Sequence, residues 1–193
     1  MKNILTILSI FLFGVLNAQT RKDTIGNNLN IKYLNSLLLE VSNEITKDSG
    51  VTYLYNEVAF KCAEYQSSYL AANAKVHNQN KNWHHNAKEH RGVLLNGVED
   101  RQKYFDKKQT LGCAGEICIL EYLNPSMTYE TLAKSIVQKF LNSTRHKKIL
   151  LSKIIEFDFL TYSATEGTYT FHNGIGVVTE KVVFVVGYLS EPK

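Results

Sequence analysis

The sequence predicts an α+β fold in which helices come first and an antiparallel sheet comes last. In the N-terminal part, apolar residues recur every three or four positions, which is the spacing of an amphipathic helix. Beyond Lys153 the spacing of the apolar residues changes to every second position. Here Ile155, Phe157 and Phe159 alternate with acidic residues, as in a strand with one buried face. This order of elements is typical of a sheet covered by helices.

The first 18 residues predict a secretory signal peptide. Lys2 is followed by an apolar run from Ile4 to Leu16, which is shorter than the roughly 20 apolar residues that cross a bilayer. Ala18 is a small residue suited to cleavage before Gln19. No later stretch is long and apolar enough to anchor the chain. We therefore expect an exported protein, secreted or periplasmic, without a membrane span.

The chain has 193 residues, and removal of the first 18 leaves 175, enough for one domain of ordinary size. We expect an N-terminal extension over 19–29 and a single domain over 30–193. Of the 22 basic residues only Lys2 is removed, so 21 basic and 18 acidic residues give the mature chain a formal charge of +3. This charge is too mild for a dedicated nucleic-acid binder.

Three stretches have the spacing of helices. The first covers about 30–45, the second runs from an N-cap at Asn56 to about Ala74, and the third begins at Thr128 and ends near Asn142. Between the second and third helices, residues 78–110 are polar and rich in Asn, Lys and His. They predict a long surface excursion with one weak helical pattern at its end.

The strand-rich part is preceded by a segment rich in glycine and cysteine, Gly112 to Cys118. Because glycine permits conformations that other residues resist, this segment predicts a loop that aims the Glu116 carboxylate inward. A short strand is predicted over 117–122, and later strands over 168–171 and 182–189, with a turn at Glu166 and Gly167.

Three cysteines in an exported chain leave one over. Cys113 and Cys118 are the nearest pair in the sequence, and they predict a disulfide that would rigidify the backbone around Glu116. Cys62 lies in the second predicted helix and is expected to be a small buried hydrophobe. A bridge from Cys62 to either of the others remains an alternative, because connectivity does not follow from sequence.

The order of these motifs resembles the CAP superfamily, also called SCP or pathogenesis-related-1-like domains. A lone histidine, His77, follows the Ala-containing helix. The family's Gly-Glu-Asn motif corresponds to Gly115-Glu116-Ile117 in this chain, with isoleucine in place of asparagine. Ser143-Thr144-Arg145-His146 matches the Ser-x-x-His motif of the bacterial members. The resemblance covers roughly 30–190 and implies a three-layer α-β-α sandwich around an open cleft.

The resemblance also implies the composition of the cleft, which in the family is lined by histidines and acidic residues and often holds a divalent metal. In this chain these residues are His77, Glu116 and His146, a set of ligands that suits Zn²⁺ with one position left for water. The second glutamate of the eukaryotic branch has no counterpart in Phe140 to Ser143. Without the resemblance, His146 is a solvated cation after a helix, so the three residues form a site together or not at all.

The function that the resemblance implies is binding or interaction by a monomer, with a small molecule, lipid or protein as the ligand. No catalytic residue is assigned, because no general base is identifiable and the fold alone does not imply an activity. Two alternatives stay open. One is a metal-dependent hydrolase of peptides or esters that uses the same cleft, and the other is a lipid- or sterol-binding protein.

Overall fold

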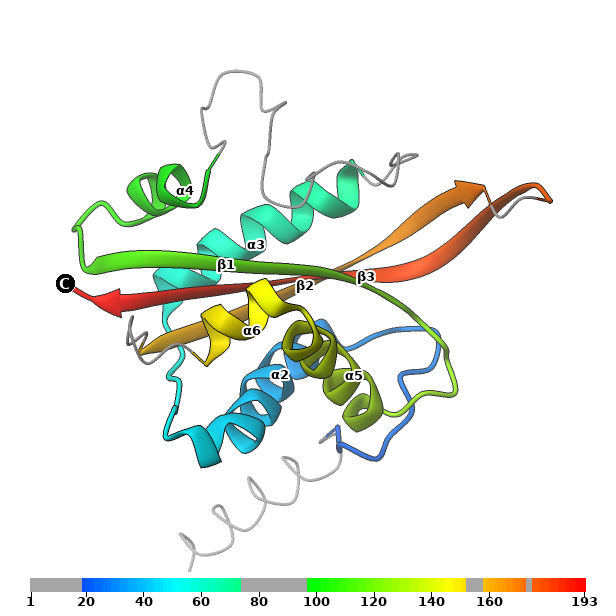
Figure 1. Cartoon of the computed structure of the whole chain (residues 1–193). Helices are drawn as coiled ribbons and strands as arrows, with labels where there is room; N and C mark the ends of the chain where they lie inside the picture. The colour runs from blue at the N-terminus through cyan, green and yellow to red at the C-terminus, as the bar shows by residue number, and fades with distance from the viewer. Residues whose placement is uncertain (1–18, 74–96, 152–157, 173–174) are drawn as a thin grey trace, which may run out of the picture.

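The computed structural model describes residues 19–73, 97–151, 158–172 and 175–193 (Figure 1). The chain is α+β, as predicted, with helices on both faces of one antiparallel sheet. The predicted signal peptide, residues 1–18, lies outside the described residues. The elements are α2 (Ile31–Thr46), a 3₁₀ turn (Lys47–Ser49), α3 (Glu57–Ala72), α4 (Val98–Phe105), β1 (Leu111–Tyr122), α5 (Tyr129–Asn142), α6 (Thr144–Leu150), β2 (Phe159–His172) and β3 (Val177–Pro192).

The described sheet has the strand order β1-β3-β2, with both pairs antiparallel. The central strand β3 is buried from Val182 to Ser190, which explains why its sequence is apolar on both faces. At Gly187 the register aligns Ile117 of β1 and Tyr162 of β2 on either side. Because β3 lies in the middle, β1 and β2 are the two edge strands of this sheet.

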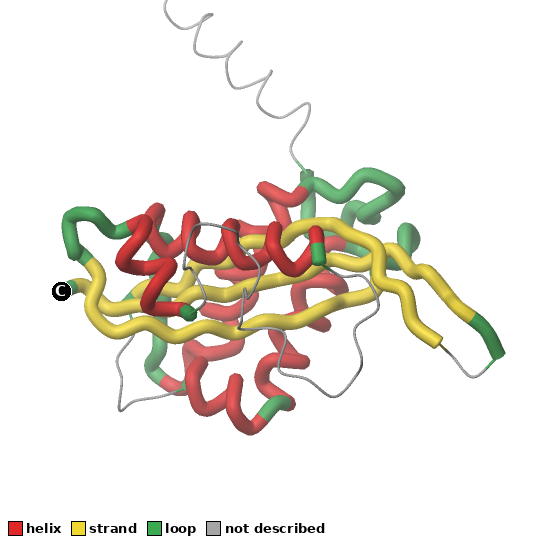
Figure 2. The backbone as a smooth tube through the Cα atoms, turned by 90° about the horizontal axis from the view of Figure 1, so that it is seen from above, coloured by secondary structure: helices red, strands yellow, loops and turns green. Residues whose placement is uncertain are grey.

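Helices cover the two faces of the sheet in separate layers (Figures 1 and 2). The helices α3 and α4 lie on one face, and α2, α5 and α6 lie on the other. Successive side chains of a strand point to opposite faces, so Ile117 of β1 joins the core beneath α2 and α5. Its neighbour Cys118 joins the core beneath α3, together with Cys62 and Tyr188.

Side-chain caps explain why the helices begin where the sequence predicted. The Asn56 side chain accepts hydrogen bonds from Val58 N–H (2.9 Å) and Ala59 N–H (3.0 Å) at the start of α3. Thr128 caps α5 by accepting from Thr131 N–H at 3.2 Å. Each cap satisfies amide groups that the first turn of a helix leaves without partners. The predicted Asn56 cap and the predicted start of the third helix are therefore confirmed.

Two segments that were predicted to be a loop and a turn lie within strands, although the pairing of β1 with β3 shifts its register between Leu111 and Ala114. The predicted loop Gly112–Cys118 belongs to β1, and the predicted turn at Glu166 and Gly167 lies inside β2. At Gly167 a Cβ would lie 3.1 Å from the Phe184 ring and 3.5 Å from Ala71 Cβ. Glycine therefore serves close packing between β2, β3 and α3 here, and its presence does not indicate a turn.

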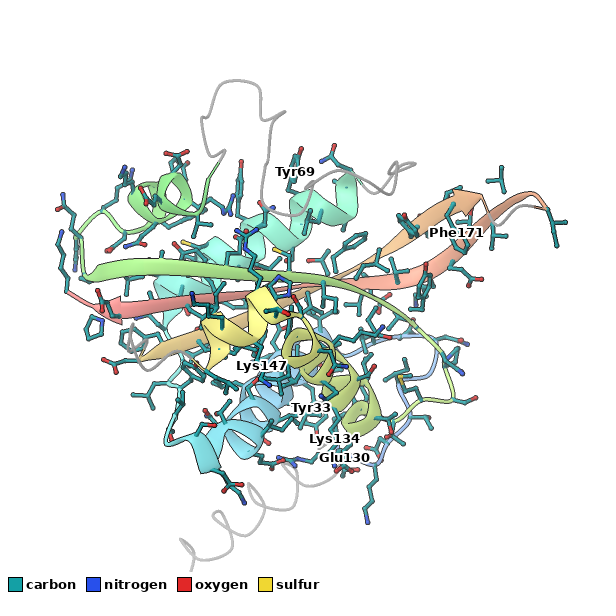
Figure 3. The ribbon with its side chains drawn as sticks, viewed as in Figure 1. Tyr33, Tyr69, Glu130, Lys134, Lys147 and Phe171 are labelled. Carbon is teal, nitrogen blue, oxygen red and sulfur yellow. The ribbon has the colours of Figure 1, made fainter. Side chains whose placement is uncertain are left out.

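The strands β2 and β3 continue as a two-stranded ribbon beyond the end of β1, where Tyr122 pairs with Val182 (Figures 1 and 2). Phe171, labelled on this ribbon in Figure 3, contacts the rings of Tyr122 and Tyr169 at centroid distances of 6.2 and 5.8 Å. This aromatic cluster supports the ribbon where it has no third strand. No helix among the described residues is long and apolar enough to cross a membrane.

Candidate functional site

The structure places Glu116 and His146 on opposite sides of the sheet. Glu116 points from β1 toward α4, where its carboxylate forms a buried ion pair with the Arg101 guanidinium. His146 lies in α6, and its ring packs edge-on against Phe140 of α5 with the centroids 5.4 Å apart. His77, the third predicted residue, lies outside the described residues. The two described members of the predicted cleft therefore do not face a common space.

The period of a β-strand explains this separation. Glu116 shares its face of β1 with Cys118, whereas Ile117 between them points to the core that contains Phe140. The described part of the chain has no group of three or more His, Cys, Asp or Glu side chains that could hold a metal ion. Among the described residues this finding contradicts the predicted metal-binding group, whereas the contribution of His77 and the choice of Zn²⁺ stay predictions.

The predicted disulfide between Cys113 and Cys118 is also wrong. Cys118 is a free thiol, and both residues belong to the single strand β1. A strand rises about 3.3 Å per residue, so two positions five residues apart lie about 16 Å apart. The Cα atoms of a disulfide lie only about 4.4–6.8 Å apart. The extended backbone therefore keeps the two Cα atoms farther apart than a disulfide allows.

The cysteines in the described cores behave as small apolar side chains. Cys62 is fully buried in α3, as predicted, and burial raises the pKa of its thiol to about 12. Burial and the neighbouring Glu116 carboxylate raise the pKa of the Cys118 thiol well above its ordinary value. Since the thiolate is the reactive form of cysteine, neither thiol is suited to nucleophilic chemistry.

The buried ion pair attaches α4 to the sheet. Arg101 and Glu116 have side-chain exposures of 0% and 1%, so a ligand in solvent does not reach them. Beside them, the Tyr188 hydroxyl donates to the main-chain oxygen of Val98 (3.1 Å) or to Gln102 Oε1 (3.2 Å). These contacts join α4 to β1 and β3. The carboxylate that the sequence singled out therefore serves the fold.

An accessible cavity of about 780 Å³ lies between α2 and α3, beside the outer edge of β2. We call it the β2-edge groove. Its volume falls within the range of roughly 300–1,000 Å³ that is usual for ligand sites. The apolar side chains that line it are Ile31 and Leu39 of α2, Tyr55, Phe60 of α3, and Tyr162 of β2. The β2-edge groove is therefore the candidate functional site.

The α2 wall of the groove consists of two neighbouring rows of side chains. One row consists of Ile31, Asn35 and Leu39, and the next consists of Lys32, Ser36 and Glu40. Within each row, successive residues are four positions apart in the sequence. Residues four apart lie one above the other on a helix. The core-facing stripe of α2 is separate and contains Leu34, Leu38 and Val41. α2 therefore has a second, partly apolar face, whose Ile31 and Leu39 are partly buried and pack against the margin of the core.

Hydrogen bonds hold the floor and the opposite wall in place. The Tyr162 hydroxyl bonds Ser42 Oγ at 2.8 Å, and burial raises the pKa of the Tyr162 phenol. Thr161 Oγ1 accepts from the Asn56 N–H at 3.0 Å, which ties the start of α3 to β2. Tyr55 and Phe60 contact each other with ring centroids 6.2 Å apart. The groove is thus built on a strand and two helices, which gives it a preformed shape.

Charged groups lie at the margins of the groove. Lys32 and Glu40 project from α2, and Glu64 projects from α3. Arg21 binds Glu40 and Glu44 at 2.8 and 2.7 Å, and its hydrogen bond lowers the pKa of the Glu44 carboxyl. The site therefore has an apolar centre with charged side chains around it, which is the usual composition of a ligand pocket.

The sequence did not predict this groove. Its walls come from the start of α2, the start of α3 and the middle of β2, which are far apart in the chain. The structure itself gives a local sign of the groove, because the neighbouring apolar residues Leu54 and Tyr55 are 60% and 54% exposed. Exposed apolar residues next to a concave surface are a general sign of a binding site.

Comparison with known proteins supports the fold. No protein-family model matches the chain, and comparison with curated proteins gives no match. Among solved structures, the chain is similar to an outer surface protein from Borrelia burgdorferi, with a TM-score of 0.54 and 18% sequence identity. The match covers 87% of this chain and 99% of that chain. At this identity, the likeness shows a shared fold.

Proposed function

We propose that this chain is an exported binding domain of the CAP-like type and that the β2-edge groove is its ligand site. The observation that carries the proposal is the groove itself, a preformed cavity of about 780 Å³ with an apolar centre and charged margins. The apolar run before Gln19 supports export. The similar structure belongs to a protein named for the outer surface, which agrees with that location.

Binding is better supported than hydrolysis. The hydrolase alternative required Glu116 and His146 in one cleft, and these residues belong to opposite faces of the sheet. Among the described residues, those that line the β2-edge groove include no histidine or cysteine. Of the two carboxylates among the described lining residues, Glu40 is paired with Arg21, and Glu64 lies on the opposite wall. A nucleophile with an adjacent base, the usual arrangement for hydrolysis, is thus not assembled in the groove as described.

The apolar walls favour two classes of ligand, an extended polypeptide and the hydrocarbon part of a lipid or sterol. Both would bury apolar surface against Ile31, Leu39 and Phe60, and each Å² of apolar surface removed from water stabilises a complex by about 25 cal/mol. The common prediction is that blocking the groove abolishes binding of any apolar ligand.

A charged side chain in the apolar wall tests the proposal. The exported chain is titrated with the fluorescent apolar probe 1-anilinonaphthalene-8-sulfonate, and we expect saturable binding. Leu39→Glu should weaken that binding by about tenfold or more, because a carboxylate is costly to bury without a partner. Ser36→Trp, at an exposed position of the same wall, should weaken it by filling the space.

The matched control is Ile45→Glu, which introduces the same charge on the same helix at a residue that is 37% exposed and lies outside the groove. Ile45→Glu should bind the probe like the parent chain. Circular dichroism checks that each variant is folded. Equal probe binding by the parent, Ser36→Trp and Ile45→Glu chains would refute the groove as the ligand site.

A further inference from the structure

The ribbon formed by β2 and β3 ends in a part of the chain that carries no Asp, Glu, Lys or Arg. The stretch from Gly167 to Thr179 is 13 residues long and lacks these four residue types, and it is the longest such stretch after residue 20. Its described residues, 168–172 and 175–179, are called the ribbon tip here. In Figures 1 and 2 the ribbon tip extends beyond the helices of both layers.

Aliphatic side chains of the ribbon tip are exposed to solvent. Ile175 is 96% exposed and Val177 is 62% exposed. Ile175 is the most exposed large hydrophobic side chain in the described part of the chain. A single exposed apolar residue is ordinary, but exposed apolar residues that gather in a segment without charges indicate contact with a partner.

Apolar side chains lie on both faces of the ribbon tip. Successive residues of a strand point to opposite faces. Phe171 and its register partner Val178 therefore lie on one face, and Val177 lies on the other. A folded protein that docked flat on the ribbon would cover one of these faces. A lipid layer surrounds an inserted segment on every side, so this distribution favours lipid.

Tyrosine rings lie at the base of the ribbon tip. Phe171 packs against Tyr122 and Tyr169 with ring centroids 6.2 and 5.8 Å apart (Figure 3). Tyr169 pairs in register with Glu180, the first charged residue of β3. Tyrosine is enriched where a membrane meets water, because its ring is apolar and its hydroxyl is polar. The ribbon tip thus has aliphatic residues at its end and tyrosines beside the first charge.

The length of the ribbon tip suits the surface of a bilayer. Tyr169 and His172 are three strand residues apart, which corresponds to about 10 Å. Interfacial segments bury their apolar side chains by about 5–10 Å at the boundary between headgroups and acyl chains. The tyrosines would then lie at the level of the headgroups.

The main chain of the ribbon limits how deep it can insert. β2 and β3 pair with each other, and the hydroxyls of Thr170 and Thr179 form a hydrogen bond at 2.9 Å. Among the described residues, no third strand pairs with the ribbon beyond Tyr122. Open sheet edges do not occur in the hydrocarbon core, where nothing bonds their N–H and C=O groups. Insertion therefore stops in the headgroup region, where water is present.

We infer that the ribbon tip inserts into the headgroup region of a phospholipid bilayer and holds the exported chain at a membrane surface. Ile175 and Val177 enter deepest, and Tyr122 and Tyr169 remain at the boundary with water. The inference does not depend on the proposed function, because none of the described residues that line the β2-edge groove belongs to the ribbon tip. Because the ribbon tip has no Asp, Glu, Lys or Arg, the contact does not require anionic lipid.

The experiment titrates the exported chain with vesicles of phosphatidylcholine, a lipid without net charge, and measures the bound fraction by sedimentation. We expect binding that persists in about 1 M salt, which screens charges beyond about 3 Å. Ile175→Glu and Val177→Glu should each weaken it by about tenfold or more, because an apolar contact is replaced by a carboxylate that is costly to bury. Ile175→Leu should bind like the parent chain.

Two control variants separate the ribbon tip from the rest of the surface. Ile45→Glu introduces the same charge at an exposed residue of α2, and Leu39→Glu alters the β2-edge groove. Both should bind the vesicles like the parent chain, and circular dichroism checks that every variant is folded. Leu39→Glu is expected to lose the fluorescent probe, so failure of the ribbon inference and failure of the groove give different results.

Three results would overturn the inference. The first is a parent chain that does not bind phosphatidylcholine vesicles. The second is undiminished binding by Ile175→Glu and Val177→Glu, including the case in which Leu39→Glu abolishes binding and thereby assigns the lipid to the groove. The third is binding that requires anionic phosphatidylglycerol and is lost in high salt, because basic side chains and not the ribbon tip would then hold the membrane.

Discussion

Asp106 ends α4 and holds the connection to β1 through three hydrogen bonds. Its Oδ1 accepts from the N–H and the hydroxyl of Thr110, both at 2.9 Å, and its Oδ2 accepts from Leu111 N–H at 2.7 Å. Burial by itself would raise the pKa of this carboxyl, but the hydrogen bonds from Thr110 and Leu111 outweigh burial and lower the pKa. Asp106 therefore stabilises the fold in its ionised form.

We predict that Asp106→Asn lowers the free energy of unfolding at neutral pH by about 1–3 kcal/mol. Because the pKa is lower in the folded chain, the stabilisation is fully present above the unfolded pKa of about 3.9 and is lost as the pH falls through the folded pKa. Urea unfolding of parent and variant across this range measures the difference. The exposed Asp48→Asn is the control. A difference that stays constant down to the lowest pH would contradict this account.

Glu116 shows why the candidate site was only partly predictable at the residue scale. The glycines and cysteines around it indicated a shaped carboxylate, and the residue is indeed buried. Its partner Arg101 lies in α4, within the excursion whose sequence has little pattern. A buried carboxylate needs a cation, but the sequence does not say which of 22 basic residues provides it. That pairing depends on tertiary structure.

At the scale of elements, α2, α3 and α5 were predictable because their signals are local, whereas α6, which contains His146, was not predicted. α2 and α3 begin and end within about two residues of the predicted bounds, since caps and apolar spacing are read within a few residues. β1 was predicted to begin six residues late, at Ile117 rather than Leu111. Its glycines resemble loop residues, and only the pairing with β3 makes the segment a strand.

Gly187 leaves room for side chains of the two neighbouring strands. A Cβ at this position would lie 2.7 Å from Ile117 Cγ1 and 2.8 Å from Tyr162 Cε1, so both side chains would have to shift. We predict that Gly187→Ala lowers the free energy of unfolding by about 1–3 kcal/mol through overpacking. Gly176→Ala is the matched control, because no atom lies within 4 Å of its added Cβ. Thermal unfolding should separate the two variants, and equal stability would contradict the close packing.

At the scale of the whole molecule, the two helical layers create the groove. α2 covers one face of β2 and α3 covers the other, and both line the cavity beside the edge of that strand. The fold class followed from the order of periodicities, but the groove requires the relative placement of three distant segments. This is why the sequence pointed to His77, Glu116 and His146, and the structure instead points to the space beside Tyr162.

Titration of the apolar probe, followed by NMR of the backbone amides, tests most directly whether the groove is the ligand site. Leu39 and Phe60 line the groove from its two helical walls, whereas Ile45 lies on α2 outside it. We predict that the Leu39 and Phe60 amide signals shift as the probe saturates the chain and that the Ile45 signal stays in place. Shifts confined to residues outside the groove, or equal shifts at all three residues, would contradict the claim.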